Sequence, residues 1–264
     1  MSELLEQIKN KYDYSDEIMN YISTILNGFL IYYSSYQQIV VDTFLNTRIV
    51  FYELKNSNEK EKLIKKYSDK TDEEIESQTL YEGGELLHKL NEDDTLEYTI
   101  IIRNDHDENV ISTLIHELCH AMVSPLTVQV DEKNMRYIKS GVSKHFLTSY
   151  EYRLNSEIEE GFTEYDTEKI CEIIGCNYTR AYQKHYDYVS ASMDNKYIAN
   201  ILLKTRLEDI NYIDKIKDED IKSKLDSYIR NYGSICNNRN RDEQKELFDI
   251  NKKIITELRK WIHG

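Results

Sequence analysis

Leu114-Ile115-His116-Glu117-Leu118-Cys119-His120-Ala121-Met122 combines the apolar spacing of a buried helix with two histidines and an acid. Histidines four positions apart lie on one helix face with Cβ atoms about 5–6 Å apart, so both imidazoles can reach one ion at roughly 2.0–2.1 Å. Glu117 points beside that ion rather than at it, which suits a general base acting on metal-bound water. The stretch therefore predicts a zinc site with His116 and His120 as ligands.

The residues around this stretch predict a strand that leads into the helix. Residues 95–103 are rich in β-branched residues, residues 104–107 are typical of a turn with helix-capping side chains, and residues 108–123 have helical apolar spacing. Two incidental core histidines would produce the same short pattern. The order of strand, turn and buried helix is the one found in zinc peptidases, and it favours the metal site.

A third ligand is expected downstream, because a catalytic zinc has three protein ligands and one open position. The pattern His116-Glu117-x-x-His120 followed by Glu160-Gly161-Phe162-Thr163-Glu164 resembles the gluzincin clan of zinc metallopeptidases, over about residues 95–170. This resemblance implies that Glu160 is the third ligand. It also implies that Glu164, one helical turn later, hydrogen-bonds a ligating histidine and fixes its tautomer.

Three neighbouring glutamates compete with Glu160 for the role of ligand. For Glu157 and Glu159 a solvated helix face is the simpler explanation, since neither is followed by an acid four residues later. Glu164 is followed in that way by Glu168, so it remains an alternative third ligand. A metzincin site is excluded, because the residues after His120 contain no glycine or third histidine in place. We interpret Cys119 as a small packing residue.

Composition predicts an α+β, mainly helical protein. The 264 residues contain one proline and eight glycines, which favours long helices over a β-sandwich. We expect a zincin-like catalytic domain with a small mixed sheet over residues 1–175 and a helical C-terminal lobe over residues 176–264. The 22 tyrosines are explained by a biased composition rather than by a binding groove.

Charge and cysteine usage restrict the partners and the compartment. A net charge of −14 disfavours a nucleic-acid partner; it is compatible with basic peptides and equally with a solvated acidic surface. The four cysteines form no Cys-x-x-Cys pair, which favours a reducing compartment. The sequence shows neither a signal peptide nor an apolar run of membrane-spanning length, so we expect a cytoplasmic protein without a membrane partner. Release by a signal-free route would leave the same sequence.

Periodicity also predicts elements outside the metal site. Before the metal site they are helices over 2–10 and 15–41, a strand over 47–54, exposed helices over 57–77 and a strand over 79–90, with Ser15 as N-cap of the second helix. After it they are a long substrate-shaping connection over 124–156 and helices over 157–174, 195–231 and 241–262. The helix over 157–174 is expected to end at Gly175 as C-cap. The gluzincin resemblance implies that residues 79–90 or 96–102 bind the substrate backbone by strand addition.

Four residues are candidates for stabilising the oxyanion. Tyr150 and Tyr152 precede the third ligand by a distance similar to that of a tyrosine in thermolysin-like enzymes. Tyr182 and His185 lie on a predicted helix from which a side chain could polarise the scissile carbonyl. Packing or exposure of an aromatic side chain explains each of them as well.

These features predict a zinc-dependent metallopeptidase with one Zn²⁺ per chain, Glu117 as general base and a peptide or protein as substrate. One alternative is a catalytically inactive zincin-like binding protein with a structural zinc. A second is a zinc hydrolase that acts on a small non-peptide molecule, and a third is a helical interaction protein without a metal.

Overall fold

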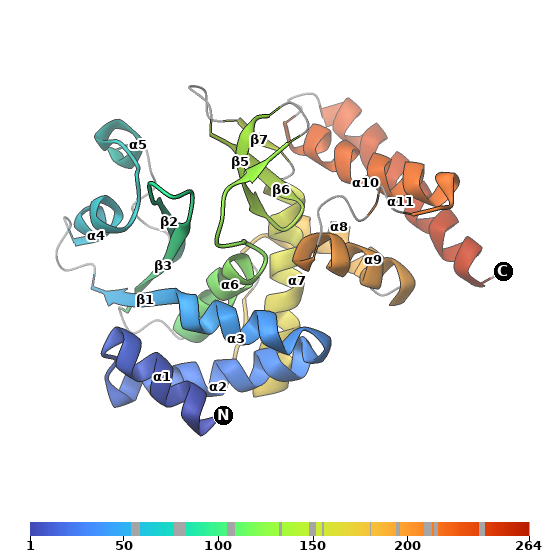
Figure 1. The fold of residues 1–264 in the computed structure, drawn as a ribbon. Coiled ribbons are helices and arrows are strands. Elements are labelled where there is room, and N and C mark those ends of the chain that lie inside the picture. The colour runs from blue at the N-terminus through green and yellow to red at the C-terminus, as the bar shows by residue number, and fades with distance from the viewer. Residues whose placement is uncertain are drawn as a thin grey trace. The chain divides into compact units, whose positions relative to one another are not determined.

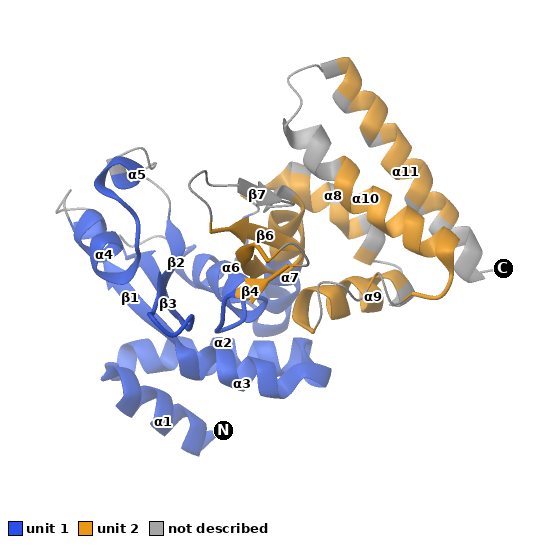
Figure 2. Ribbon diagram, turned by 45° about the horizontal axis from the view of Figure 1, so that its top comes forward, with its two compact units in different colours: residues 1–128, 166–179 blue, residues 129–165, 180–264 orange. Residues whose placement is uncertain are grey.

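The computed structural model describes most of the chain, as helices and strands that confirm the predicted α+β, mainly helical class (Figure 1). The described residues are 1–53, 59–76, 83–104, 109–131, 134–147, 152–154, 156–179, 181–193, 196–208, 213, 216–237 and 241–263. They form two compact units, one of residues 1–128 and 166–179 and the other of residues 129–165 and 180–264 (Figure 2). The domain boundary expected near residue 175 stays a prediction.

The first unit begins with helices α1 (Ser2–Tyr12), α2 (Asp16–Tyr32) and α3 (Gln37–Asn46), with the one-turn 3-10 helix η1 (Ser34–Tyr36) between the last two. Ser15 is the N-cap of α2, as predicted, and its hydroxyl oxygen accepts the N–H of Ile18. The single helix expected over residues 15–41 is wrong. The break falls at Ser34 and Ser35, whose side chains compete with the backbone for hydrogen bonds and so disfavour helix interiors.

The first unit also contains the small mixed sheet that the sequence predicted. Its strands are β1 (Thr47–Tyr52), β2 (Gly84–Leu90) and β3 (Leu96–Arg103), in the order β1-β3-β2. β3 is parallel to β1 and antiparallel to β2. The central position of β3 explains its run of buried residues from Tyr98 to Ile102, because both of its faces are covered. Helices α4 (Glu59–Tyr67) and α5 (Asp72–Glu76) lie between β1 and β2 in the chain.

Helix α6 (Val110–Met122) follows β3 and carries the predicted metal-binding residues. The expected order of strand and buried helix is therefore confirmed, whereas the expected turn falls largely on residues 105–108, outside the described part of the chain. Cys119 is fully buried, as expected of a packing residue.

The second unit contains an antiparallel sheet where the sequence predicted a long connection. Its strands, in the order β4-β5-β6-β7, are β4 (Gln129–Val130), β5 (Arg136–Ser140), β6 (Ser143–Phe146) and β7 (Tyr152–Leu154). The long connection expected over residues 124–156 therefore contains four short strands rather than a loop, and its role in shaping a substrate site stays a prediction. These strands are short, and the buried Lys139 interrupts the apolar pattern of β5, so periodicity gives little signal.

The remaining elements confirm a helical C-terminal region. They are α7 (Ser156–Ile174), α8 (Gln183–Met193), α9 (Lys196–Leu207), α10 (Glu219–Asn237) and α11 (Arg241–His263). Gly175, with φ of 71°, follows α7 as the predicted C-cap. The helix expected over 195–231 is divided, because α9 ends at Leu207 and α10 begins at Glu219. None of the helices in the described ranges is long and apolar enough to cross a membrane.

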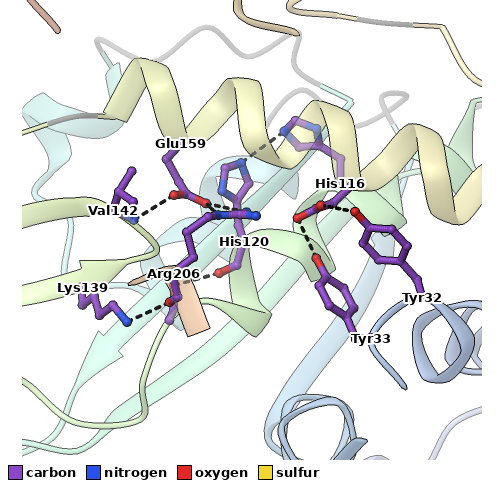
Figure 3. Close-up of polar contacts among 10 residues, drawn as sticks. Tyr32, Tyr33, His116, His120, Lys139, Val142, Glu159 and Arg206 are labelled. Carbon is purple, nitrogen blue, oxygen red and sulfur yellow. Dashed lines mark hydrogen bonds and ion pairs between the residues drawn. The ribbon is translucent and has the colours of Figure 1, made fainter. Parts of the chain in front are cut away.

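A buried carboxylate fastens the second half of α7 to α2 within the first unit. Asp166 is fully buried and accepts hydrogen bonds from the hydroxyls of Tyr32 and Tyr33, each at 2.7 Å. In Figure 3 the dashed lines from the hydroxyls of Tyr32 and Tyr33 mark these two hydrogen bonds. The Tyr33 hydroxyl is itself buried, so this bond is shielded from water.

We expect Tyr33→Phe to lower the free energy of unfolding by about 1–3 kcal/mol, because it removes a donor to a buried charge. Chemical denaturation followed by circular dichroism measures this loss. The control is Tyr67→Phe, which removes a hydroxyl and leaves the contact of the Tyr67 ring with Arg48. Equal stability of the two variants would show that the Tyr33 hydrogen bond contributes nothing.

Candidate metal centre

Helix α6 brings the two predicted histidines together. His116 and His120 lie one turn apart, and their Nε2 atoms are 3.2 Å from each other (Figure 3). The ring planes are inclined by 74°, so the two nitrogens converge without stacking of the rings. Both rings are partly accessible, whereas the apolar residues Leu114, Ile115 and Leu118 of the same helix are buried. The apolar side chains of the helix are thus packed in the interior, and the face that carries the two histidines is partly accessible to solvent.

Glu160 on α7 completes a possible metal-binding triad. One ligand atom each from His116, His120 and Glu160 lies within 4.8 Å of the other two. These three residues are the group with suitable ligand spacing among the described histidines, cysteines and acids. The sequence predicted this group from the spacing of the histidines and from the resemblance of residues 160–164.

The donor atoms fit a zinc ion. Two imidazole nitrogens bound to zinc at roughly 2.0–2.1 Å in tetrahedral geometry are about 3.3 Å apart. The observed separation of 3.2 Å matches this value. Two imidazoles and one carboxylate are also the ligand set of zinc sites that keep one position open for water. The nature of the donors and the spacing of the two nitrogens therefore fit a zinc ion.

The competing glutamates have different surroundings. The prediction that Glu159 lies on a solvated helix face is wrong. Only 1% of Glu159 is exposed, and it forms an ion pair with Arg206. Glu164 is equally buried, and the gathered triad contains Glu160 in its place. Its predicted hydrogen bond to a ligating histidine stays a prediction. The side chain of Glu157 lies outside the described part of the chain.

Glu117, the predicted general base, lies against the start of strand β2. Only 9% of Glu117 is exposed. A methyl group added at Gly84 would approach the Cγ of Glu117 to 3.1 Å and the Cγ2 of Thr113 to 2.7 Å. Glycine at position 84 therefore allows β2 to contact the face of α6 that carries Glu117. The role of Glu117 in catalysis stays a prediction.

The sheet order decides between the two strands expected to bind substrate. β3 has strand neighbours on both sides, which excludes residues 96–102, whereas β2 lies at an edge of the sheet as far as the described strands show. The N–H of Arg103 donates to the carbonyl of Gly83, and the N–H of Asn91 donates to that of Thr95. Because hydrogen bonding alternates along an antiparallel pair, the backbone polar groups of Gly84 and Leu86 point to the outer edge.

The structure describes the side chains of two of the four oxyanion candidates, Tyr182 and His185. Tyr150 lies outside the described residues, and of Tyr152 only the backbone is described, in β7. Tyr182 is 40% exposed, and its ring lies 5.7 Å from that of His185. The backbone carbonyl of His185 lies so near Gly161 that a methyl group there would approach it to 2.5 Å. Their part in catalysis stays a prediction.

Sequence reasoning missed the residues that hold α7 in place. Arg206, Tyr33 and Asp166 form buried polar contacts with or on this helix, yet none belongs to a recognisable motif. A faint signal was available in α7 itself, because Glu159, Thr163 and Asp166 occupy positions that a soluble helix usually fills with apolar residues.

Comparisons with models of protein families, with curated proteins and with solved structures give no match to this chain. Its function is therefore inferred from the chemistry of the His116, His120 and Glu160 group and of the residues around it.

Proposed function

We propose that this protein is a zinc-dependent, gluzincin-like metallopeptidase. His116, His120 and Glu160 would hold the ion, and Glu117 would act as general base. The observation that supports the proposal is the gathering of two imidazole nitrogens and a carboxylate from separate helices, with Glu117 directly after the first ligand. A structural role of the two histidines alone would require neither the carboxylate nor the adjacent acid.

A bound zinc ion would supply a water molecule of lowered pKa and a Lewis acid for the substrate carbonyl. Glu117 accepts the proton of the attacking water and returns it to the leaving amine, which makes the same side chain base and then acid. Its burial excludes most bulk water from the carboxylate. Such exclusion strengthens the electrostatic effect of the ion on this proton transfer.

A peptide is the substrate class that the neighbouring strand favours. The outer edge of β2 offers the backbone groups of Gly84 and Leu86, and Gly84 lies against the helix face that carries Glu117. An extended peptide can add to such an edge as a further strand, with its backbone held by hydrogen bonds. A small non-peptide substrate would make no use of this edge.

We expect the purified chain to contain about one zinc per molecule and to cleave a mixed peptide library, and a chelator to abolish the cleavage. Metal analysis and mass spectrometry of the products measure the two properties. Restoration of cleavage by added zinc is the control for damage by the chelator. Zinc without cleavage would favour the binding protein or the non-peptide hydrolase, and a chain that binds no zinc would refute the proposed site.

We also propose that the protein works in a reducing compartment such as the cytoplasm. Cys119, Cys171 and Cys176 are not disulfide-bonded, and Cys119 lies inside the helix that carries both histidines. Burial is the main cause that raises the pKa of the Cys171 thiol, so this thiol stays protonated and unreactive at neutral pH.

A further inference from the structure

The residue before the proposed third ligand belongs to a buried network of charges in the second unit. The Glu159 carboxylate accepts a hydrogen bond from Nε of Arg206 at 2.8 Å and forms an ion pair with its NH2 group at 2.7 Å. The other carboxylate oxygen accepts the N–H of Val142 at 2.9 Å. Figure 3 shows Glu159 between these two partners.

Arg206 is itself held from several sides. Its guanidinium lies 4.9 Å from the centre of the Phe162 ring, and its backbone carbonyl accepts a hydrogen bond from Nζ of Lys139 at 2.8 Å. No part of the Arg206 side chain is exposed, and Lys139 is buried as well. The network thus links the α9 and α7 helices with strand β5 through groups of fixed geometry.

The turn between β5 and β6 is shaped to this carboxylate. Gly141 has φ of 58°, a conformation that side chains other than glycine rarely adopt. A methyl group at this position would also fall about 2.0 Å from the Glu159 carboxylate oxygen, which is impossible without rearrangement. The backbone of the turn therefore closes directly over Glu159, and the N–H of Val142 is part of this contact.

The residue after the proposed ligand is fixed as well. A methyl group at Gly161 would approach Cγ2 of Val189 to 2.4 Å, so helix α8 packs on the bare backbone of α7 at this point. Ile158 and Phe162 on the same turn are fully buried in the core of the second unit. Within residues 158–162, Glu160 is therefore partly exposed, whereas the other four residues are buried and held by the contacts described above.

We propose that the Glu159–Arg206 pair positions Glu160 for metal binding by fixing the rotation of α7 about its axis. A carboxylate lies roughly 5–6 Å from the helix axis, so a rotation of about 5° moves it by about 0.5 Å. Metal–ligand distances tolerate only about 0.2 Å. Apolar packing of Ile158 and Phe162 already restricts such a rotation. The charge-assisted hydrogen bond that Nε of Arg206 donates to the Glu159 carboxylate adds a restraint with a preferred direction. The inference rests on the proposed zinc site, and Glu159 and Arg206 are positioning residues rather than ligands.

The test measures zinc affinity and cobalt spectra of the full chain. Glu159→Gln is expected to weaken zinc binding roughly 10–100-fold, as is typical of residues that orient a metal ligand. It should also alter the visible absorption of the cobalt-loaded protein, which reports the coordination geometry. The double variant Glu159→Leu/Arg206→Met replaces the pair by apolar groups that keep the packing. It should remain folded when apo, by thermal unfolding in the presence of a chelator, yet bind zinc as weakly as Glu159→Gln.

The control variant is Asn251→Leu, which disrupts another buried polar contact of the same unit. Asn251 donates to the carbonyl of Tyr228 and accepts from Asn231. This variant should lose stability without loss of zinc affinity. Positioning is refuted if the double variant binds zinc within about threefold of the native chain with an unchanged cobalt spectrum, whatever Glu159→Gln does. A native chain that binds no zinc would refute the proposed function and this inference together. A native chain that binds zinc, with a double variant that binds it equally well, would refute the inference alone.

Discussion

Glu117→Gln is expected to retain zinc and to lose peptide cleavage. The amide has nearly the shape of the carboxylate but cannot accept a proton, so the variant lacks the base while His116, His120 and Glu160 are unchanged. General bases of this kind contribute roughly 10²–10⁴-fold to rate. A loss of this size in kcat/KM, measured on a peptide found in the library assay, together with unchanged zinc content, is the expected result.

The same substitution elsewhere on the metal-site helices serves as control. Glu172→Gln removes an acid on α7 that is 59% exposed and pairs with Lys169, and it should leave cleavage unchanged. Full activity of Glu117→Gln would remove this residue from the mechanism. Loss of zinc from that variant would instead assign Glu117 a role in metal binding.

Separate substitution of Glu160 and Glu164, the two competing acids on α7, distinguishes the metal ligand from a residue that only orients a ligand. Glu160→Gln should release zinc and abolish cleavage, because a neutral amide is a poor replacement for an anionic ligand. Glu164→Gln should weaken zinc binding only about 10–100-fold, as expected of a residue that orients a ligand. Competition with a chromophoric chelator measures both affinities.

The order of the two effects is decisive. A greater loss in Glu164→Gln than in Glu160→Gln would make Glu164 the ligand, although the structure gathers Glu160 with the histidines. Glu164 is nearly fully buried, so its substitution also lowers stability. Unfolding of both apo variants in the presence of a chelator corrects for this contribution.

The part of the site carried by one helix was predictable. His116, Glu117 and His120 depend only on the helical period, which places residues four apart on one face. The preceding strand was predictable for a similar reason, since residues 98–102 are rich in β-branched residues and lie at the centre of the sheet. Glu160 required more, because only its resemblance to a known ligand pattern distinguished it from Glu159 and Glu164.

The second unit shows where prediction from sequence failed. The strands β4 to β7 are two to five residues long, and β5 contains the buried Lys139, so no alternating pattern marks them. The buried charge of Glu159 is neutralised by Arg206, which lies 47 positions later. A polar pair of this kind has no local signature, because each member resembles a surface residue until its partner is known.

The sequence by itself therefore determined the class of fold through its composition, and the two histidines with their adjacent acid through the helical period. It determined the expectation of a later carboxylate through the resemblance to a known ligand pattern. The tertiary structure decided that Glu160, which the sequence favoured, rather than its alternative Glu164 is gathered with the histidines. It also decided that β2 rather than β3 lies at an edge of the described sheet, and that Glu159 is buried against Arg206. These depend on contacts between distant segments, and the free energy of such contacts is set by packing and burial rather than by local periodicity.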